Sequence, residues 1–156
     1  MVIDADGKER ITAFTNSDGT ASVQCLDKDG NVRIAARTFA SGQAIVQWRD
    51  KDENVRIAAG TRADGQAVVQ WRDKDGKGRI MGTTLVDGDA SVDWFDKDGE
   101  VWISAATLAD REARVVWLDA DGKRRISETT NTDGTVDLPT KDLNPPKKSS
   151  PKKPKP

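Results

Sequence analysis

The feature that most constrains this chain is an internal repeat with a period of 23 residues. The segment QAIVQWRDKDE at 43–53 returns almost unchanged as QAVVQWRDKDG at 66–76. Alignment at this period gives six copies, which span 3–25, 26–48, 49–71, 72–94, 95–117 and 118–140. A chain built from near-identical short units is expected to form an array in which each unit packs against its neighbours.

Three positions of the repeat are almost constant. The ninth position is Ile and the thirteenth is Thr in every copy. The twenty-third position is Trp in the four middle copies, whereas the two outer copies have Cys25 and Thr140 there. Atypical outer copies are typical of a stacked array, because its ends face solvent instead of a neighbour.

Each copy predicts one β-hairpin. Segments such as RIAAGT and AVVQW alternate with a period of two residues, and turns containing Asp-Gly separate them. No segment has a convincing helical period. The sequence therefore predicts an all-β fold in which six tandem β-hairpins form a twelve-strand antiparallel meander.

The pairing register follows from the residues that share a face. Directly opposed residues on antiparallel strands point the same way, so the turn at 63–65 is expected to be a three-residue loop with Thr61 opposite Ala67. The D-x-D-G turn is expected to have an even loop of two or four residues. Ile57 then lies between Trp48 and Trp71.

One face of the predicted sheet is apolar, and we expect it to be the core or oligomer face. It carries Ile34, Ile57, Ile80, Ile103, Trp48, Trp71, Trp94 and Trp117. Twelve strands ~4.8 Å apart give it an area on the order of 1,000 Å², larger than the ~300–600 Å² apolar patch of a typical monomer. The sequence therefore predicts a homo-oligomer, either a trimeric β-prism, which we favour, or a two-sheet sandwich.

Two other architectures are compatible with the repeat. Pairs of copies match propeller blades in length, although a dimer would have to complete the ring. A β-trefoil also has six hairpins, but it would require odd and even copies to differ. A simple closed barrel is disfavoured, because equivalent residues of successive copies form straight rows across the sheet and leave no net shear.

The motif D-x-D-G-x-x-R-I…T-x-x-D-G resembles the tandem hairpin repeats of uncharacterised bacterial proteins and of trimeric phage tail-fibre segments. The resemblance covers about residues 3–140 and implies an elongated, trimeric, noncatalytic module. The period is also similar to that of MORN repeats. The Tyr-x-Gly and Gly-x-Gly signatures of that family are missing here, so its membrane and partner roles are not carried over.

The other face predicts a candidate ligand site. It consists of Arg49, Arg56, Arg72, Arg79, Phe95 and Trp102. In the predicted register Arg49 faces Arg56, Arg72 faces Arg79, and Phe95 faces Trp102. One interpretation is that these arginines pair with turn carboxylates such as Asp50 and Asp73. The other is a patch that binds a glycan or an anionic ligand, since guanidinium groups bind anions and aromatic rings stack on sugars.

Composition argues against catalysis. The chain has no His and no Tyr, so it lacks the commonest general base and metal ligand, and we expect no enzyme activity and no cofactor. The D-x-D-G turns resemble part of a calcium loop but lack its third ligand position and its distant Glu. Asp residues also cap turns. The sequence therefore favours structural turns, with no metal site.

The last segment, KDLNPPKKSSPKKPKP at 141–156, differs from the repeats at 1–140. It carries a net charge of +5, whereas residues 1–140 carry −6. Its Lys and Pro content predicts a disordered, extended tail, which is either a solvated end or a contact for nucleic acid, an anionic surface or the acidic array. No apolar stretch suits a membrane span or signal peptide, which predicts a cytoplasmic protein; a phage or virion-associated product has the same features.

Overall fold

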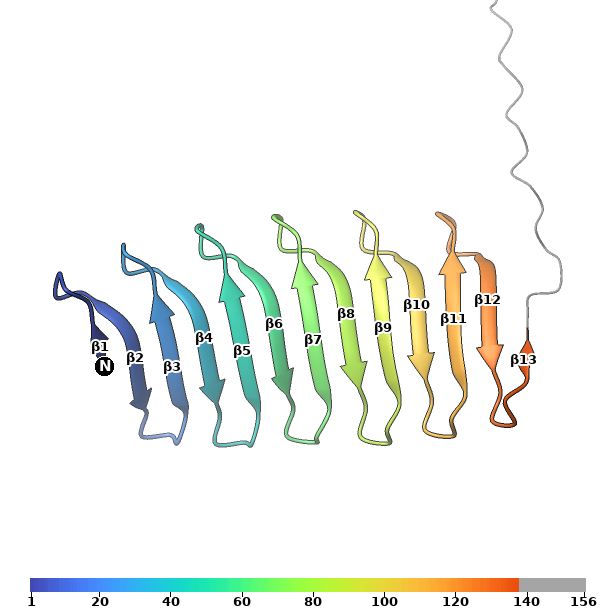
Figure 1. Ribbon diagram of the computed structural model, residues 1–156, viewed down its shortest axis with the longest axis horizontal. Helices are drawn as coiled ribbons and strands as arrows, with labels where there is room; N and C mark the ends of the chain where they lie inside the picture. Colours follow the sequence, from blue (N-terminus) through green and yellow to red (C-terminus); the bar gives the residue numbers. More distant parts are fainter. Residues whose placement is uncertain (138–156) are drawn as a thin grey trace, which may run out of the picture.

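The computed structural model describes residues 1–137 as one antiparallel sheet of thirteen strands that follow one another in chain order (Figure 1). The strands are β1 (Val2–Ile3), β2 (Glu9–Thr15), β3 (Ala21–Leu26), β4 (Val32–Thr38), β5 (Ala44–Arg49), β6 (Val55–Thr61), β7 (Ala67–Arg72), β8 (Gly78–Thr84), β9 (Ala90–Phe95), β10 (Val101–Thr107), β11 (Ala113–Leu118), β12 (Arg124–Thr130) and β13 (Val136–Asp137).

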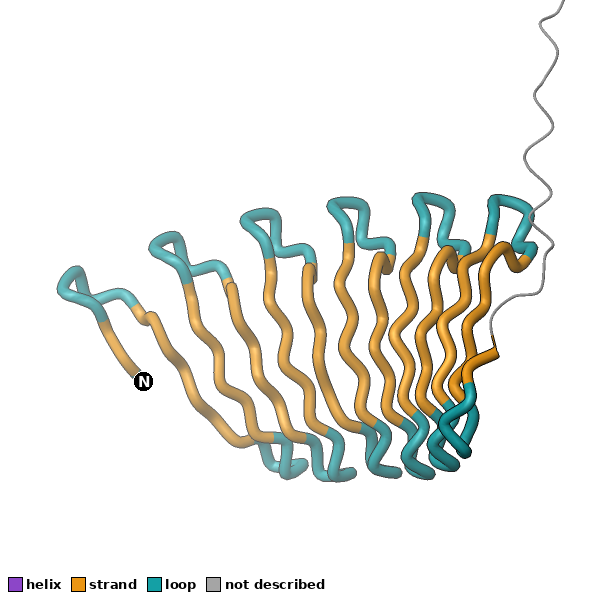
Figure 2. The backbone as a smooth tube through the Cα atoms, turned by 45° about the vertical axis from the view of Figure 1, so that its right-hand side comes forward, coloured by secondary structure: helices purple, strands orange, loops and turns teal. Residues whose placement is uncertain are grey.

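The sheet is a single open layer, with β1 at one end and β13 at the other (Figure 1). Figure 2 shows that it twists along its length, as expected of right-handed strands. The predicted all-β meander is confirmed, and β1 adds a strand to the twelve expected. Neither a propeller nor a trefoil is present within the described part. The predicted tail at 141–156 lies outside it. Within residues 1–137 no helix could cross a bilayer.

The turns of the x-D-G type have the three-residue loop expected from the sequence. At one of them the Arg62 N–H donates to the Gln66 carbonyl at 2.8 Å, and the Gly65 N–H donates to the Arg62 carbonyl at 3.0 Å. Thr61 consequently lies opposite Ala67. The prediction for this turn is confirmed.

The D-x-D-G turns differ from the expectation. The Asp50 N–H donates to the Asn54 carbonyl at 3.0 Å, which makes a second three-residue loop in place of an even one. Trp48 nevertheless lies opposite Ile57, because the register shifts between Trp48 and Arg49 and Arg49 pairs with Val55. A β-bulge therefore supplies the extra residue, Arg56, that restores the parity.

The bulge overturns the expected pairs of the outer face. Arg49 lies opposite Val55 and not Arg56, and Arg72 lies opposite Gly78 and not Arg79. In the same way Phe95 lies opposite Val101 and not Trp102. The like-charge and aromatic pairs expected from the sequence are therefore wrong, because the eighth residue of each copy is the bulged one.

The two faces of the sheet are unequally covered. We call the side that carries Ile at the ninth and Trp at the twenty-third repeat position the Trp face, and the other side the Arg face. On the Trp face, Trp48, Trp71 and Trp94 remain 38%, 40% and 36% exposed. The most buried apolar side chains, Ala35 and Val116, are on the Arg face by strand parity. A single layer buries side chains only against their neighbours on the same face, so the described chain has no closed core.

Candidate interaction face

The Trp face carries an unbroken row of alternating Ile and Trp side chains across the sheet. Ile57 lies opposite Trp48 on one side and Trp71 on the other, as the sequence predicts. The same pairing is repeated by the remaining predicted residues: Ile34 with Trp48, Ile80 with Trp71 and Trp94, and Ile103 with Trp94 and Trp117. The structure therefore brings all eight residues of the predicted apolar set together.

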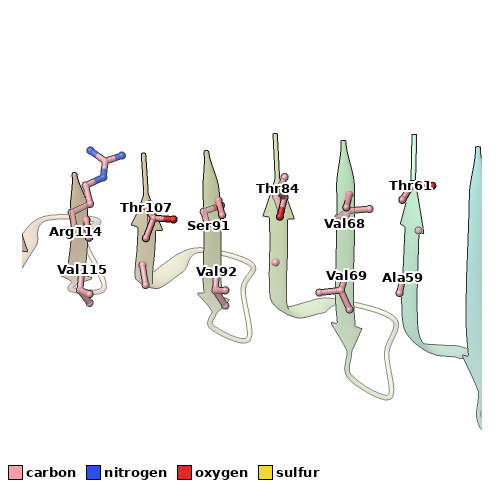
Figure 3. A pocket seen from close by; sticks show the side chains of 18 of the residues that line it. Ala59, Thr61, Val68, Val69, Thr84, Ser91, Val92, Thr107, Arg114 and Val115 are labelled. Atoms are coloured by element: carbon pink, nitrogen blue, oxygen red, sulfur yellow. The ribbon is translucent and has the colours of Figure 1, made fainter. Parts of the chain in front are cut away.

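Beside this row, small side chains leave a shallow apolar groove of about 850 Å³ that extends from β5 to β12. Figure 3 shows its rows: Thr61, Thr84 and Thr107 lie at one level, and Val69, Val92 and Val115 lie at a second. Most of its lining belongs to the Trp face by register. The groove arises because the repeat places Ala, Gly or Thr at alternate positions, where larger side chains would fill the space.

The lining of the groove is mainly apolar. Its polar side chains are mainly threonine hydroxyls, with Arg114 and Glu128 toward the β12 end. No group of three or more His, Cys, Asp and Glu side chains that could hold a metal ion occurs among residues 1–137. What this face offers is a long apolar surface with a hollow in it, next to a raised row of Trp and Ile.

The bulged arginines form a second regular feature, a ladder along the edge of the sheet that carries the D-x-D-G turns. Arg33 forms an ion pair with the Asp27 carboxylate of its own turn and donates to the backbone carbonyl of Asp50 in the next turn. Arg79 joins Asp73 to the carbonyl of Asp96 in the same way. Arg10, Arg33 and Arg79 therefore each join two neighbouring turns.

The carboxylate at the start of each D-x-D-G turn is held in its ionised form. Burial opposes ionisation of Asp50, but the N–H groups of Asn54 and Asp52 and the charge of Arg56 outweigh it and lower the Asp50 pKa below its ordinary value. The same direction of pKa shift is found at Asp4, Asp27, Asp73, Asp96 and Asp119. One oxygen of each carboxylate accepts backbone N–H groups of its own turn, as at Asp50 and Asp96, which is expected of structural turns.

The predicted ligand residues of the Arg face are mostly engaged within the chain. The Arg56 Nε lies 2.9 Å from the Asp50 carboxylate, and Arg79 pairs with Asp73, so the carboxylate interpretation is confirmed for both. Arg49 donates to the Gln47 side chain at 3.1 Å, and Arg72 donates to Gln70 at 2.9 Å.

The aromatic members of that set are separated by the bulge. Trp102 occupies the slot that holds Arg in the other copies and is 50% exposed, whereas Phe95 is half-buried and faces Val101. Because Trp102 has no guanidinium group, it interrupts the arginine ladder at the turn of Asp96.

Sequence reasoning missed the ladder, although a signal for it exists. Asp at the second position and Arg at the eighth occur together in five of the six copies, and Trp102 is the single exception. That spacing places the Asp at the start of the turn and the Arg at the bulge after it, within reach of each other. The pairs of Arg10 with Asp4 and Arg125 with Asp119 complete the set.

No family model and no curated protein matches this sequence. Among solved structures, the SAS-4 (dCPAP) TCP domain of Drosophila melanogaster, in complex with a proline-rich motif of Ana2 (dSTIL), is similar with a TM-score of 0.40 and 14% identity, over 84% of this chain and 90% of that one. A mutant of S. aureus TarM in complex with fondaparinux, α-GlcNAc-glycerol and UDP has a TM-score of 0.27 and 13% identity, over 83% of this chain and 21% of that one. Likenesses at these scores carry no argument about function.

Proposed function

We propose that this protein is a noncatalytic interaction scaffold that self-associates through its Trp face. The observation that carries the proposal is the exposure of a row of Trp and Ile side chains on a single-layer sheet that has no second layer among residues 1–137. Contiguous apolar surface of this kind marks protein contact sites.

A second copy is the occupant that the Trp face fits best. The apolar area estimated for this face, on the order of 1,000 Å², is comparable with the ~800 Å² that each partner contributes to a standard interface. Its rows of Ile, Trp and Val recur in the same register in the middle copies, so equivalent rows of another sheet can match them there. We favour a trimer, with three sheets around one axis as a β-prism, because each sheet then faces the two others and all three Trp faces are covered.

A glycan or anion site on the Arg face receives less support. The bulge separates the expected pairs, and Arg56 and Arg79 are bound to turn carboxylates. The exposed ring of Trp102 is the remaining feature of that patch.

The test is the solution mass of the full chain, measured by light scattering on a sizing column, for the unmodified protein and for Trp71→Glu. We expect the unmodified protein at three times 17.0 kDa or more. Trp71→Glu places a charge in the middle of the Trp face, and burying an unpaired carboxylate in an apolar interface is strongly unfavourable. We expect this variant to dissociate.

Gln70→Glu is the matched control. It introduces the same charge at the adjacent residue, but on the Arg face and beside Arg72, which already donates to the Gln70 side chain. This variant should keep the mass of the unmodified protein. Circular dichroism checks that both variants keep their strands. An unmodified protein that is monomeric at high concentration would refute self-association through the Trp face.

A further inference from the structure

The repeats inside this chain show how one copy of the array receives the next. Each internal Ile of the Trp face has a twenty-third-position side chain on both sides, as Ile57 has with Trp48 and Trp71. Three arginines of the ladder, Arg10, Arg33 and Arg79, reach forward to a carbonyl of the following turn, as Arg33 does to Asp50. The surface that ends one copy is therefore complementary to the surface that begins the next.

Among residues 1–137, β12 presents this receiving surface with only part of its neighbour, the two residues of β13. Within the described residues Ile126 has Trp117 opposite it on one side only. The Arg125 side chain, which pairs with Asp119, is 49% exposed, whereas Arg10 and Arg33 are 25% and 27% exposed. The difference arises because Arg10 and Arg33 are covered by a following turn, which residues 1–137 do not place beside Arg125.

β1 presents the matching surface on the side that does not face β2. Val2 and Ile3 pair with β2 near the D-x-D-G edge, where Val2 occupies the slot that holds Trp in the middle copies and lies opposite Ile11. The Asp4 carbonyl accepts the Gly7 N–H, as the Asp27 carbonyl accepts the Gly30 N–H. The Asp27 carbonyl also accepts Arg10, the bond for which Asp4 has no donor within residues 1–137.

The two outermost strands cover opposite halves of their neighbours. β1 lies along the half of β2 next to the D-x-D-G turns, whereas β13 pairs with Thr129 and Thr130 at the other end of β12 (Figure 1). In the repeat, the residues of β13 correspond to Ala44 and Ile45, and Val2 and Ile3 correspond to Trp48 and Arg49. β13 and β1 are therefore the two halves of one repeat strand such as β5.

We propose that these two edges bind each other between copies of the chain. β13 of one copy and β1 of a second copy then lie end to end as one strand between β12 of the first and β2 of the second. In this arrangement Val2 of the second copy lies opposite Ile126, and the Asp4 carbonyl of the second copy accepts a hydrogen bond from Arg125. The pairing repeats the contacts of β4 with β5 and of β5 with β6 inside the chain.

This head-to-tail contact is separate from the Trp-face contact and does not rest on it. It uses different surfaces on the two partners, so each added copy exposes a fresh edge, and the sheet grows as a linear array or closes as a ring. It also covers the backbone N–H and C=O groups that edge strands otherwise leave unpaired.

The test is disulfide trapping in the full chain. Val2→Cys and Ile126→Cys are combined in a Cys25→Ala background, which removes the native thiol. Directly opposed residues have Cβ atoms about 4.5–5.5 Å apart, near the separation that a disulfide spans. Positions 2 and 126 lie at opposite ends of the sheet, so one chain cannot join them by itself (Figure 1). After mild oxidation we expect a non-reducing gel to show most of the protein as covalent dimers and larger species.

The register-shifted pair Val2→Cys with Ser127→Cys is the control, because adjacent strand residues point to opposite faces. We expect its yield of covalent species to be at least fivefold lower. For the matched pair, a series of covalent species of increasing size indicates a linear array, and a single covalent species indicates a closed ring. Either result supports the proposal. Equal yields from the two pairs, or no covalent species from a folded matched pair, would overturn it.

Discussion

Glu53 and Arg111 occupy turn positions at which the other copies have glycine. Both adopt left-handed backbone, with φ angles of 63° and 75°. The equivalent glycines of the following copies, Gly76 and Gly134, have φ angles of 78° and 82°. A side chain at such a φ angle costs about 1–2 kcal/mol. Two of the twelve turns are therefore built with residues that do not favour the required conformation.

We predict that Glu53→Gly stabilises the fold. Glycine removes the steric cost but loses more backbone entropy on folding, so we expect the free energy of unfolding to rise by about 0.5–1 kcal/mol. Urea denaturation followed by circular dichroism measures it. The reverse change, Gly76→Glu, should lower the free energy of unfolding by a similar amount. A Glu53→Gly variant that is less stable than the unmodified protein would contradict this account.

At the scale of one element, the D-x-D-G turn and the bulge after it form a single unit. The turn carboxylate accepts two backbone N–H groups with one oxygen and an arginine with the other, as Asp27 does with Asp29, Asn31 and Arg33. The bulge orients the arginine side chain toward the turn carboxylate. Ionisation of that one carboxylate therefore supports loop, bulge and ladder together.

We predict that this unit makes stability depend on acid pH. The Asp50 pKa is lower in the folded state than the ordinary value of about 3.9, so folding favours the ionised form. Its contribution is fully present above the unfolded pKa and is lost as the pH falls through the lower folded pKa. We expect the thermal midpoint to be nearly constant between about pH 7 and pH 5 and to fall below about pH 4.

Asp50→Asn isolates one carboxylate from the rest. Its amide oxygen still accepts the backbone N–H groups of Asp52 and Asn54, but the group neither titrates nor pairs with the charge of Arg56. The variant should be less stable near pH 7, and its thermal midpoint should fall less on acidification. If the thermal midpoints of both proteins fall by the same amount between pH 7 and pH 3, the Asp50 carboxylate is not the source of the pH dependence.

For the whole molecule, the structure offers two surfaces that lead to different assemblies. Contacts between Trp faces give a closed group of packed sheets, whereas contacts between the two edges lengthen a single sheet. We predict that they act independently, because Trp71 lies in β7, at the middle of the sheet, and Val2 and Ile126 lie in strands at its ends.

Adding Trp71→Glu to the Val2→Cys, Ile126→Cys variant distinguishes the Trp-face contact from the edge contact. We expect the yield of covalent species to change by less than twofold, while the reduced protein has the low mass of the Trp71→Glu variant. Light scattering under reducing conditions and a non-reducing gel measure the two effects. Loss of both association and cross-linking would show that the edge contact depends on the face.

Much of this molecule could be predicted from the sequence because side chains in a strand alternate with a period of two. That period and the 23-residue repeat determine an all-β meander, the three-residue loop between Thr61 and Ala67, and the position of Ile57 between Trp48 and Trp71. They also determine that the apolar face is continuous across the sheet and larger than the apolar patch of a typical monomer. These features depend only on parity and on the identity of the copies.

Only the tertiary structure decided how the D-x-D-G turns keep Trp and Ile side chains on the same face of the sheet. An even loop, or a three-residue loop followed by a bulge, places Trp48 opposite Ile57 equally well, so the sequence pattern does not distinguish them. The choice matters because the bulged residue is Arg56 or its equivalent, which turns toward a carboxylate instead of toward another arginine. The ladder depends in addition on contacts between residues 17 apart in neighbouring turns, such as Arg33 and Asp50, which exist only once the strands lie side by side.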